Sequence, residues 1–461
     1  MSSAENVIEK LSGLLGAEHV IADVSRMEHY GGDALSEGRI HPLRKPNSSN
    51  PLCIVYPAST EDVREIVLLA NAEKISIVPY GGGSGLMGGA ISLLAGIVLD
   101  LKRMQRVLEI DAEAETVRVG AGIVLESLAD RLEKKKLMLG HDPWTLPVAT
   151  VGGAISTNSL GYRGGKYGSM GDQVLGLEVV LPSGEILRTR PIPKSSTGID
   201  LKRLFIGGEG CFGVATEATL RVFPLPAKRS LRVYNFPSFE AGFSAVQEIF
   251  SAALRPVLLD FGDDSEKTRG GADLYLGFEG VKEMVELEER LAGNICENGG
   301  ARSLPQKEAE RFWDERHVIA HLFMHNRQRR RWRRGDPFIR DWLHVALPAS
   351  RVLPYRAKAM EIIARRGLHL QESGLWTRPE LFSLRMATGD GSSDPLVLQE
   401  TIDDLIAQVQ EMGGSMEYCH GVGLKLAPFM AAEHGYGLEV MRQIKKALDP
   451  NDIMNPGKMG L

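Results

Sequence analysis

Glycine-rich segments that each follow a strand are the feature that most constrains this chain. The segment VPYGGGSGLMGGA (78–90) comes directly after the predicted strand ISIVPY. Three more segments of this kind are DPWTLPVATVGGAISTNSLGYRGGKYG (142–168), LFIGGEGCFGVATEATL (204–220) and NPGK (455–458). Backbone amides without side chains can approach a diphosphate closely. Together these segments predict one elongated ligand lying along a groove, although the first loop alone could equally be a flexible turn.

Two common nucleotide-binding motifs do not explain the first segment. Gly83, Gly85 and Gly88 match the spacing of the dinucleotide fingerprint, but that fingerprint must open a long helix. Here AISLLAG is too short for such a helix, and another predicted strand, IVLDL, follows at once. The Walker phosphate loop is absent as well. The segment is therefore predicted to be a glycine-rich loop after a strand.

Length and composition limit the classes of protein that the chain can be. A chain of 461 residues exceeds the size of one hydrophobic core, so two or three structural units are expected. A formal net charge of -5 argues against nucleic acid as the main partner. The four cysteines show no CxxC spacing, which favours a reducing compartment. With no signal peptide and no run of 18 apolar residues, we expect a cytoplasmic protein, with peripheral membrane association left open.

The pattern along the chain predicts an α+β protein with a boundary near residue 228. Short strands and helices alternate up to ATEATLRVFPLP (215–226), where two prolines close the last strand of this part. One of these helices is predicted over 59–74, where a Ser-x-x-Asp cap precedes apolar residues at helical spacing. The expected units are 1–228, 229–416 and a C-terminal segment, 417–461.

The motifs resemble the FAD-binding domain of the vanillyl-alcohol oxidase superfamily, also called PCMH-type. The branch is that of glycolate oxidase FAD subunits and D-lactate dehydrogenases. PYGGGSGLMGGA, TVGGAISTN, KYGSMGDQVLGLEVVLPSGEIL, LFIGGEGCFGVATEATLRVFPLP and LDPNDIMNPGK occur in the order typical of that family. The resemblance implies a two-subdomain FAD-binding domain, an α+β cap domain for the substrate, and a C-terminal segment that returns to the flavin. It also implies an FAD-dependent oxidoreductase that acts on CH–OH groups, such as a 2-hydroxyacid dehydrogenase.

Carried over residue by residue, the resemblance assigns the cofactor contacts. The diphosphate would lie in the first glycine loop and the flavin and ribityl group along the second segment. The third segment would lie near the adenine and ribityl side and the last near the isoalloxazine. The residues concerned are Pro79, Gly81, Gly82, Gly83, Ser84, Gly85, Pro143, Thr150, Gly153, Ser156, Asn158, Glu209, Gly213, Val214 and Asn455. Some relatives attach FAD through a histidine in the first loop, which has none here, so noncovalent FAD is expected.

The resemblance also assigns the substrate side of the site. Hydroxyacid dehydrogenases of the family carry His-Gly-Asp-Gly-x-x-His on one strand and later Glu-His-Gly-x-Gly, and many hold a divalent metal there. In this chain LFSLRMATGDGSSD (381–394) has no histidine, and Cys419 replaces the glutamate. We therefore expect no metal at this site and a metal-independent base, His420. Arg316 is expected to hold a substrate carboxylate, with Arg385 and Tyr418 as weaker candidates.

Several alternatives remain open at this point. CHGVG also resembles alkyldihydroxyacetonephosphate synthases, flavoenzymes that catalyse a non-redox exchange. The chain could instead be a flavin-carrying subunit that passes electrons to an acceptor protein, or a homo-oligomer. His420 could be merely structural, and Arg316 could form a surface ion pair on a helix. The histidines at 317, 321 and 325 share one predicted helical face, as metal ligands or as a packed ridge. The arginine run at 327–334 is either a solvated face or a docking site for an acidic protein, an anionic membrane or a phosphorylated substrate.

Overall fold

The computed structural model describes residues 3–27, 30, 32–45, 50–265, 269–328, 339–388 and 394–461. Gly389, Asp390, Gly391 and most of the arginine run lie outside these described residues. Among the described residues, strands and helices mix throughout the chain, so the α+β prediction is confirmed. No helix of the described part is both long and apolar enough to cross a membrane.

A small sheet forms the first part of the N-terminal half. Its strand order is β1-β2-β4-β3, and β2, β4 and β3 run parallel. Helix α3 (Thr60–Glu73) begins at the Ser59 cap, whose side chain accepts a hydrogen bond from Asp62 N–H, and it buries its apolar face. The strands are β1 (Val20–Ile21), β2 (Cys53–Val55), β3 (Ile77–Tyr80) and β4 (Ile97–Asp100), preceded by α1 (Ser3–Leu15). Parallel strands covered by helices read as continuous apolar runs, as these do.

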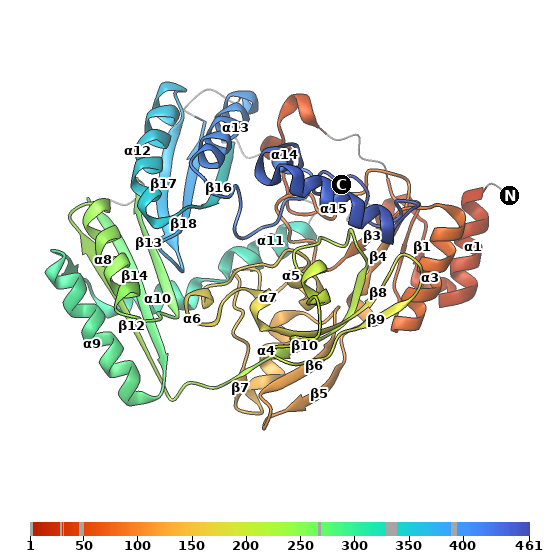
Figure 1. Cartoon of the computed structure of the whole chain (residues 1–461), viewed down its shortest axis with the longest axis horizontal. Coiled ribbons are helices and arrows are strands. Elements are labelled where there is room, and N and C mark those ends of the chain that lie inside the picture. The colour runs from red at the N-terminus through yellow and green to blue at the C-terminus, as the bar shows by residue number, and fades with distance from the viewer. Residues whose placement is uncertain are drawn as a thin grey trace.

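A second, antiparallel sheet completes this half. The strand order is β5-β6-β10-β8-β9, and β10 pairs with both β6 and β8. Its strands are β5 (Val107–Asp111), β6 (Thr116–Gly120), β8 (Val174–Val180), β9 (Ile186–Arg188) and β10 (Val214–Arg221). Helices α4 (Leu125–Glu133), α5 (Val151–Ser156), α6 (Gly164–Tyr167) and α7 (Met170–Gln173) connect β6 to β8, with β7 (Leu137–Met138) between α4 and α5. Figure 1 shows the two sheets side by side, away from the sheet of the next unit.

A seven-stranded antiparallel sheet organises the region after residue 228. The order is β15-β12-β14-β13-β17-β18-β16. The strands are β12 (Lys228–Phe236), β13 (Leu258–Asp264), β14 (Ala272–Gly280), β15 (Arg302–Ser303), β16 (Arg340–Ala346), β17 (His369–Trp376) and β18 (Leu381–Ala387). The helices are α8 (Phe239–Ser251), α9 (Lys282–Asn298), α10 (Gln306–Glu315), α11 (Val318–Gln328), α12 (Ala349–Arg365) and α13 (Pro395–Glu411). The division into three units stays a prediction.

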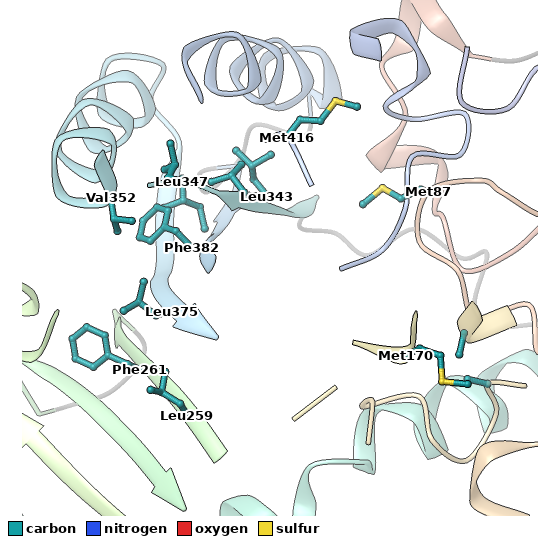
Figure 2. Packing of buried hydrophobic residues seen from close by; sticks show 14 of the residues in the cluster. Met87, Met170, Leu259, Phe261, Leu343, Leu347, Val352, Leu375, Phe382 and Met416 are labelled. Carbon is teal, nitrogen blue, oxygen red and sulfur yellow. The ribbon is translucent and has the colours of Figure 1, made fainter. Parts of the chain in front are cut away.

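Aromatic and aliphatic side chains between the seven-stranded sheet and its helices form the core of this region. Phe261 and Phe382 are almost fully buried, and Figure 2 shows Phe382 close to Val352 of α12. Complete burial of a side chain of this size stabilises a fold by roughly 1.5–3 kcal/mol. This core holds the seven-stranded sheet, including its edge strand β16, against the helices. The chain that leaves α13 begins beside this sheet.

The last residues return to the first sheet. After α14 (Met430–His434) and α15 (Tyr436–Leu448), Met454 forms a parallel bridge with Ile77 of β3. Asn455 N–H donates to Ile77 O at 2.8 Å. Figure 1 shows α15 lying beside β3 and β4, close to the C-terminus. The end of the chain therefore lies next to the strand that leads into the first glycine loop.

Candidate active site

A cavity that is partly open to solvent runs between the glycine segments. Most of the predicted cofactor residues line it: Pro79, Gly81, Gly82, Gly83, Ser84, Gly85, Pro143, Thr150, Gly153, Ser156, Glu209, Gly213 and Val214. Cys419 and His420 line it as well. Sequence reasoning missed Asp33 and Trp144, which also face this space. One elongated ligand can therefore touch the glycine loop and His420 together.

The first glycine loop packs so tightly that side chains do not fit. A Cβ atom on Gly81 would lie 2.3 Å from Thr150 Oγ1, and one on Gly82 would lie 2.1 Å from Val148 O. Gly83 has a φ of 62°, in the left-handed region that favours glycine. The loop thus presents bare backbone to the cavity, as the diphosphate of FAD requires.

Two predicted cofactor residues lie outside the lining and support it from behind. Asn158 accepts a hydrogen bond from Gly171 N–H at 3.0 Å. Asn455 is buried and donates to Gly89 O at 2.9 Å and to Glu209 O at 2.7 Å. The Asn455 Oδ1 atom is buried without a hydrogen-bond partner, so it can still accept a hydrogen bond. The bare loop backbone at the cavity fits FAD, and Asn158 and Asn455 support the wall behind it.

Glu417 organises the turn that carries His420. Its Oε1 atom accepts hydrogen bonds from the N–H groups of Tyr418 (3.1 Å), Cys419 (2.7 Å) and His420 (2.9 Å). The same oxygen lies 3.4 Å from His420 Nδ1, and the His420 side chain is 12% exposed. One buried carboxylate therefore fixes the backbone of the turn and pairs with the imidazole.

His344 of β16 lies against His420, with ring centroids 4.5 Å apart. Burial lowers the pKa of His344 to about 3, helped by the positive charge of His420. Burial alone also lowers the pKa of His420, but its interactions with Cys419 and Glu417 outweigh burial and raise this pKa to about 10. His420 in turn holds the pKa of Glu417 below its usual range, although burial raises it. His420 is therefore an imidazolium at neutral pH, and His344 is neutral.

The positions that hold a metal in the resembling dehydrogenases carry other residues here. Thr388 stands at the first upstream histidine position and Cys419 at the glutamate position. A different set, His344, Glu417 and His420, has its ligand-type atoms within 4.8 Å of one another. Because two of these three form an ion pair, we treat the set as a proton-binding cluster. The absence of a metal stays a prediction, and sequence reasoning missed His344 because its strand lies far upstream.

Arg316 does not line the cavity. It follows α10, and its Nε donates to Asp142 Oδ2 at 3.0 Å, while its guanidinium lies 4.1 Å over the Trp313 ring. His317 Nε2 lies 2.8 Å from Asp142 Oδ1. Burial raises the pKa of Asp142, but the His317 hydrogen bond and the charges of Arg163 and Arg316 hold it well below the usual range. Arg316 is thus part of a buried network that joins the cap region to the segment preceding Pro143.

The remaining candidates also lie outside the cavity lining. Arg385 lies 3.8 Å from both Asp264 and Glu372, and Tyr418 packs at 5.5 Å from His344. The histidine ridge expected from spacing does not form, because His317 contacts Asp142 while the histidines at 321 and 325 are exposed. The assignment of Arg385 and Tyr418 to substrate binding stays a prediction.

Comparisons with known proteins agree with this arrangement. A model of the FAD binding domain matches residues 51–190, and a model of the C-terminal domain of FAD linked oxidases matches residues 225–459. The glycolate oxidase subunit GlcD of Bacillus subtilis is 29% identical over 89% of each chain. The D-lactate dehydrogenase of Anaerostipes hadrus is 29% identical over 93% of this chain and 94% of that one. The alkyldihydroxyacetonephosphate synthase of Dictyostelium discoideum is 27% identical over 89% and 73%.

Solved structures show the same fold. A p-cresol methylhydroxylase superposes with a TM-score of 0.79 at 19% identity, covering 100% of this chain and 98% of that one. An alkyldihydroxyacetonephosphate synthase gives 0.76 at 22% identity, covering 98% and 84%. The PCMH-type fold expected from the motifs is confirmed, and the cofactor is FAD. The chain is an FAD-dependent oxidoreductase and belongs to the FAD-linked oxidases.

Proposed function

We propose that this enzyme oxidises a hydroxyacid or a related alcohol, with His420 as the base. The observation that carries the proposal is that His420 lines the same cavity as the glycine loop. FAD bound in this cavity would supply the hydride acceptor, which is the flavin N5 atom. His420 takes the hydroxyl proton at the cavity wall, where Glu417 orients its ring. In this proposal the relatives' metal site is not used, and FAD is bound noncovalently.

The raised pKa of His420 gives this proposal a specific consequence. A base must be neutral to accept a proton, whereas Glu417 and Cys419 favour the imidazolium form. Activity should therefore rise with pH towards the His420 pKa, and the optimum should be alkaline. A flat profile between neutral and alkaline pH would contradict a role for His420 as the base.

Substrate recognition is proposed to involve Arg316, which lies outside the cavity lining in this structure and would have to turn from its buried network to reach a substrate. The Asp142 carboxylate and the Trp313 ring hold its guanidinium in one orientation. A planar guanidinium held in this way can bind a carboxylate through two hydrogen bonds. Arg385 and Tyr418 remain secondary candidates.

The experiment is anaerobic mixing of the FAD-loaded protein with glycolate, D-lactate and D-2-hydroxyglutarate. Relatives named glycolate oxidase subunit, D-lactate dehydrogenase and D-2-hydroxyglutarate dehydrogenase motivate this choice of substrates. Oxidation would bleach the visible band of the flavin. If no hydroxyacid bleaches it, or if His420→Ala turns over as fast as the parent enzyme, the proposal fails. Metal analysis of the same protein adds a second check, because stoichiometric metal lost in His344→Ala would contradict the metal-independent mechanism.

A second function is supported by Cys419-His420-Gly421-Val422-Gly423 and by the relatives named alkyldihydroxyacetonephosphate synthase. In this alternative the enzyme exchanges an acyl for an alkyl group without net redox turnover. Conversion of substrate without any electron acceptor would favour it. A third possibility follows from the relative named as a subunit: the chain acts in a complex and passes electrons to a partner protein. Activity that appears only with a co-purified partner would favour that function.

A further inference from the structure

Glu209 occupies a strained position where three segments meet. It precedes β10 in a glycine-rich turn and has a φ of 47°, in the left-handed region. Its N–H donates to Ser156 O at 2.9 Å, and its carbonyl oxygen accepts from Asn455 at 2.7 Å. Non-glycine residues keep such a backbone only where their surroundings enforce it, often at functional sites. Here the backbone directs the Glu209 carboxylate towards the segment that follows His420.

The Glu209 carboxylate accepts hydrogen bonds from two consecutive backbone groups after His420. Val422 N–H lies 2.5 Å from Oε1, and Gly423 N–H lies 2.9 Å from Oε2. A Cβ atom on Gly421 would lie 2.6 Å from Oε1, so the carboxylate also packs against that residue. Charge-assisted hydrogen bonds of this kind are about twice as strong as neutral ones.

The other side of this loop is fixed by Met87. Its carbonyl oxygen accepts hydrogen bonds from Leu424 N–H at 2.8 Å and Lys425 N–H at 3.0 Å. A Cβ atom on Gly423 would lie 2.1 Å from the same oxygen. The loop is therefore held between two parts of the FAD-binding half, and Glu209 supplies the charged contact beside His420.

We propose that Glu209 is a positioning residue that fixes the 421–423 loop and thereby sets the place of His420 on the cavity wall. This inference rests on the proposed role of His420. The sequence suggested a cofactor contact for Glu209, and the residue does line the cavity. The hydrogen bonds to Val422 and Gly423 add a function that acts through the loop. A role in cofactor contact alone predicts that a substitution of Glu209 weakens FAD binding. The positioning role predicts that it frees the 421–423 loop and exposes His420.

The test uses the FAD-loaded protein and needs no substrate. Glu209→Gln keeps the size and one acceptor oxygen but turns an amide NH₂ towards one of the two N–H donors. We compare the rate at which diethyl pyrocarbonate modifies His420, mapped by mass spectrometry, with the dissociation constant for FAD. At about pH 8.5 Glu209 is ionised, since burial raises its pKa to about 7. Diethyl pyrocarbonate acylates only neutral imidazole, so each rate is divided by the neutral fraction of His420, obtained from the pH dependence of labelling in that variant.

The positioning role predicts that Glu209→Gln modifies His420 at least about tenfold faster, because the loop opens more often. FAD affinity is measured alongside, because Glu209 also lines the cavity. Glu433→Gln is the matched control, since Glu433 accepts from Met416 N–H before the same turn and lies outside the cavity lining; its labelling rate should equal that of the parent. Unchanged His420 labelling in folded Glu209→Gln would overturn the proposal, whatever the FAD affinity.

A second variant keeps the test decisive if Glu209→Gln does not fold. Gly421→Ala places a methyl group against the carboxylate from the opposite side and should expose His420 in the same way. Unchanged labelling in this folded variant would also overturn the proposal. Once a substrate is found, positioning predicts a lower kcat with little change in KM. Failure of every hydroxyacid would refute the proposed function and leave the labelling result intact, so the two failures are distinguishable.

Discussion

Removal of the Glu417 charge should lower the pH at which the enzyme becomes active. In Glu417→Gln the amide oxygen can still accept from the three N–H groups of the turn, so the backbone should keep its shape. Only the negative charge 3.4 Å from His420 Nδ1 is lost. The His420 pKa, raised to about 10, should then fall, and the neutral base should form nearer to neutral pH.

The distance gives the magnitude. At 3.4 Å two unit charges attract by about 5 kcal/mol at an effective dielectric of about 20, which sets the upper bound. Close ion pairs in proteins shift a pKa by about 1–3 units. We therefore expect the midpoint of the rise of kcat/KM with pH to shift to lower pH by that amount. At pH 7 each unit increases the neutral fraction about tenfold.

The assay is the pH profile of kcat/KM in chelator-treated buffer, with any hydroxyacid that reduces the flavin. Glu433→Gln serves again as the control, because it removes a carboxylate near the same turn that does not pair with His420. If kcat/KM of Glu417→Gln rises at the same pH as that of the parent enzyme, the electrostatic reasoning is refuted. If kcat/KM of the parent enzyme does not rise with pH, the assignment of His420 as the base is refuted.

Five further outcomes are expected. Asp142→Asn leaves Arg316 and its neighbours without a buried counter-charge and should lower the free energy of unfolding by about 3 kcal/mol, measured by urea denaturation. Because the pKa of Asp142 in the folded protein is depressed, its contribution to the free energy of unfolding is complete above about pH 4 and is lost only as the pH falls further. The parent protein should therefore show no loss of stability from this group between about pH 5 and 8. Gly82→Ala should abolish FAD binding by titration, since its Cβ would meet Val148 O; retained affinity would contradict the tight loop. Acid precipitation should release all flavin, and flavin left on the protein would disprove noncovalent binding. Iodoacetamide should label Cys419 before the other three cysteines, which do not line the cavity.

Local signals explain how much of the fold the sequence predicts. The helix expected over 59–74 is found as α3, because its cap and its apolar spacing lie within one segment. The glycine loops are recognisable for a similar reason: where the backbone must lack a side chain, the sequence itself has glycine. The contacts that demand glycine, such as Gly82 against Val148, still had to be seen in three dimensions.

The environment of His420 could not be predicted in the same way. His344 reaches it only because β16 pairs with β18 at the edge of the seven-stranded sheet. Glu417 stands two positions before the family's glutamate position, so a motif comparison passes over it. For Arg316 the sequence indicates an arginine that could hold a carboxylate. It cannot show that Asp142, far earlier in the chain, lies within hydrogen-bonding distance. Long-range pairing decides these contacts.

The return of the chain end to β3 has a consequence for the N-terminal half taken alone. Asn455 links Gly89 to Glu209, and Lys458 donates to Ile91 O at 2.8 Å, so the final residues tie the wall of the cavity together. These residues follow both sheets of the N-terminal half in the sequence, so a fragment made of that half alone lacks their contacts. We therefore expect the N-terminal half alone to bind FAD more weakly than the chain that includes residues 455–458.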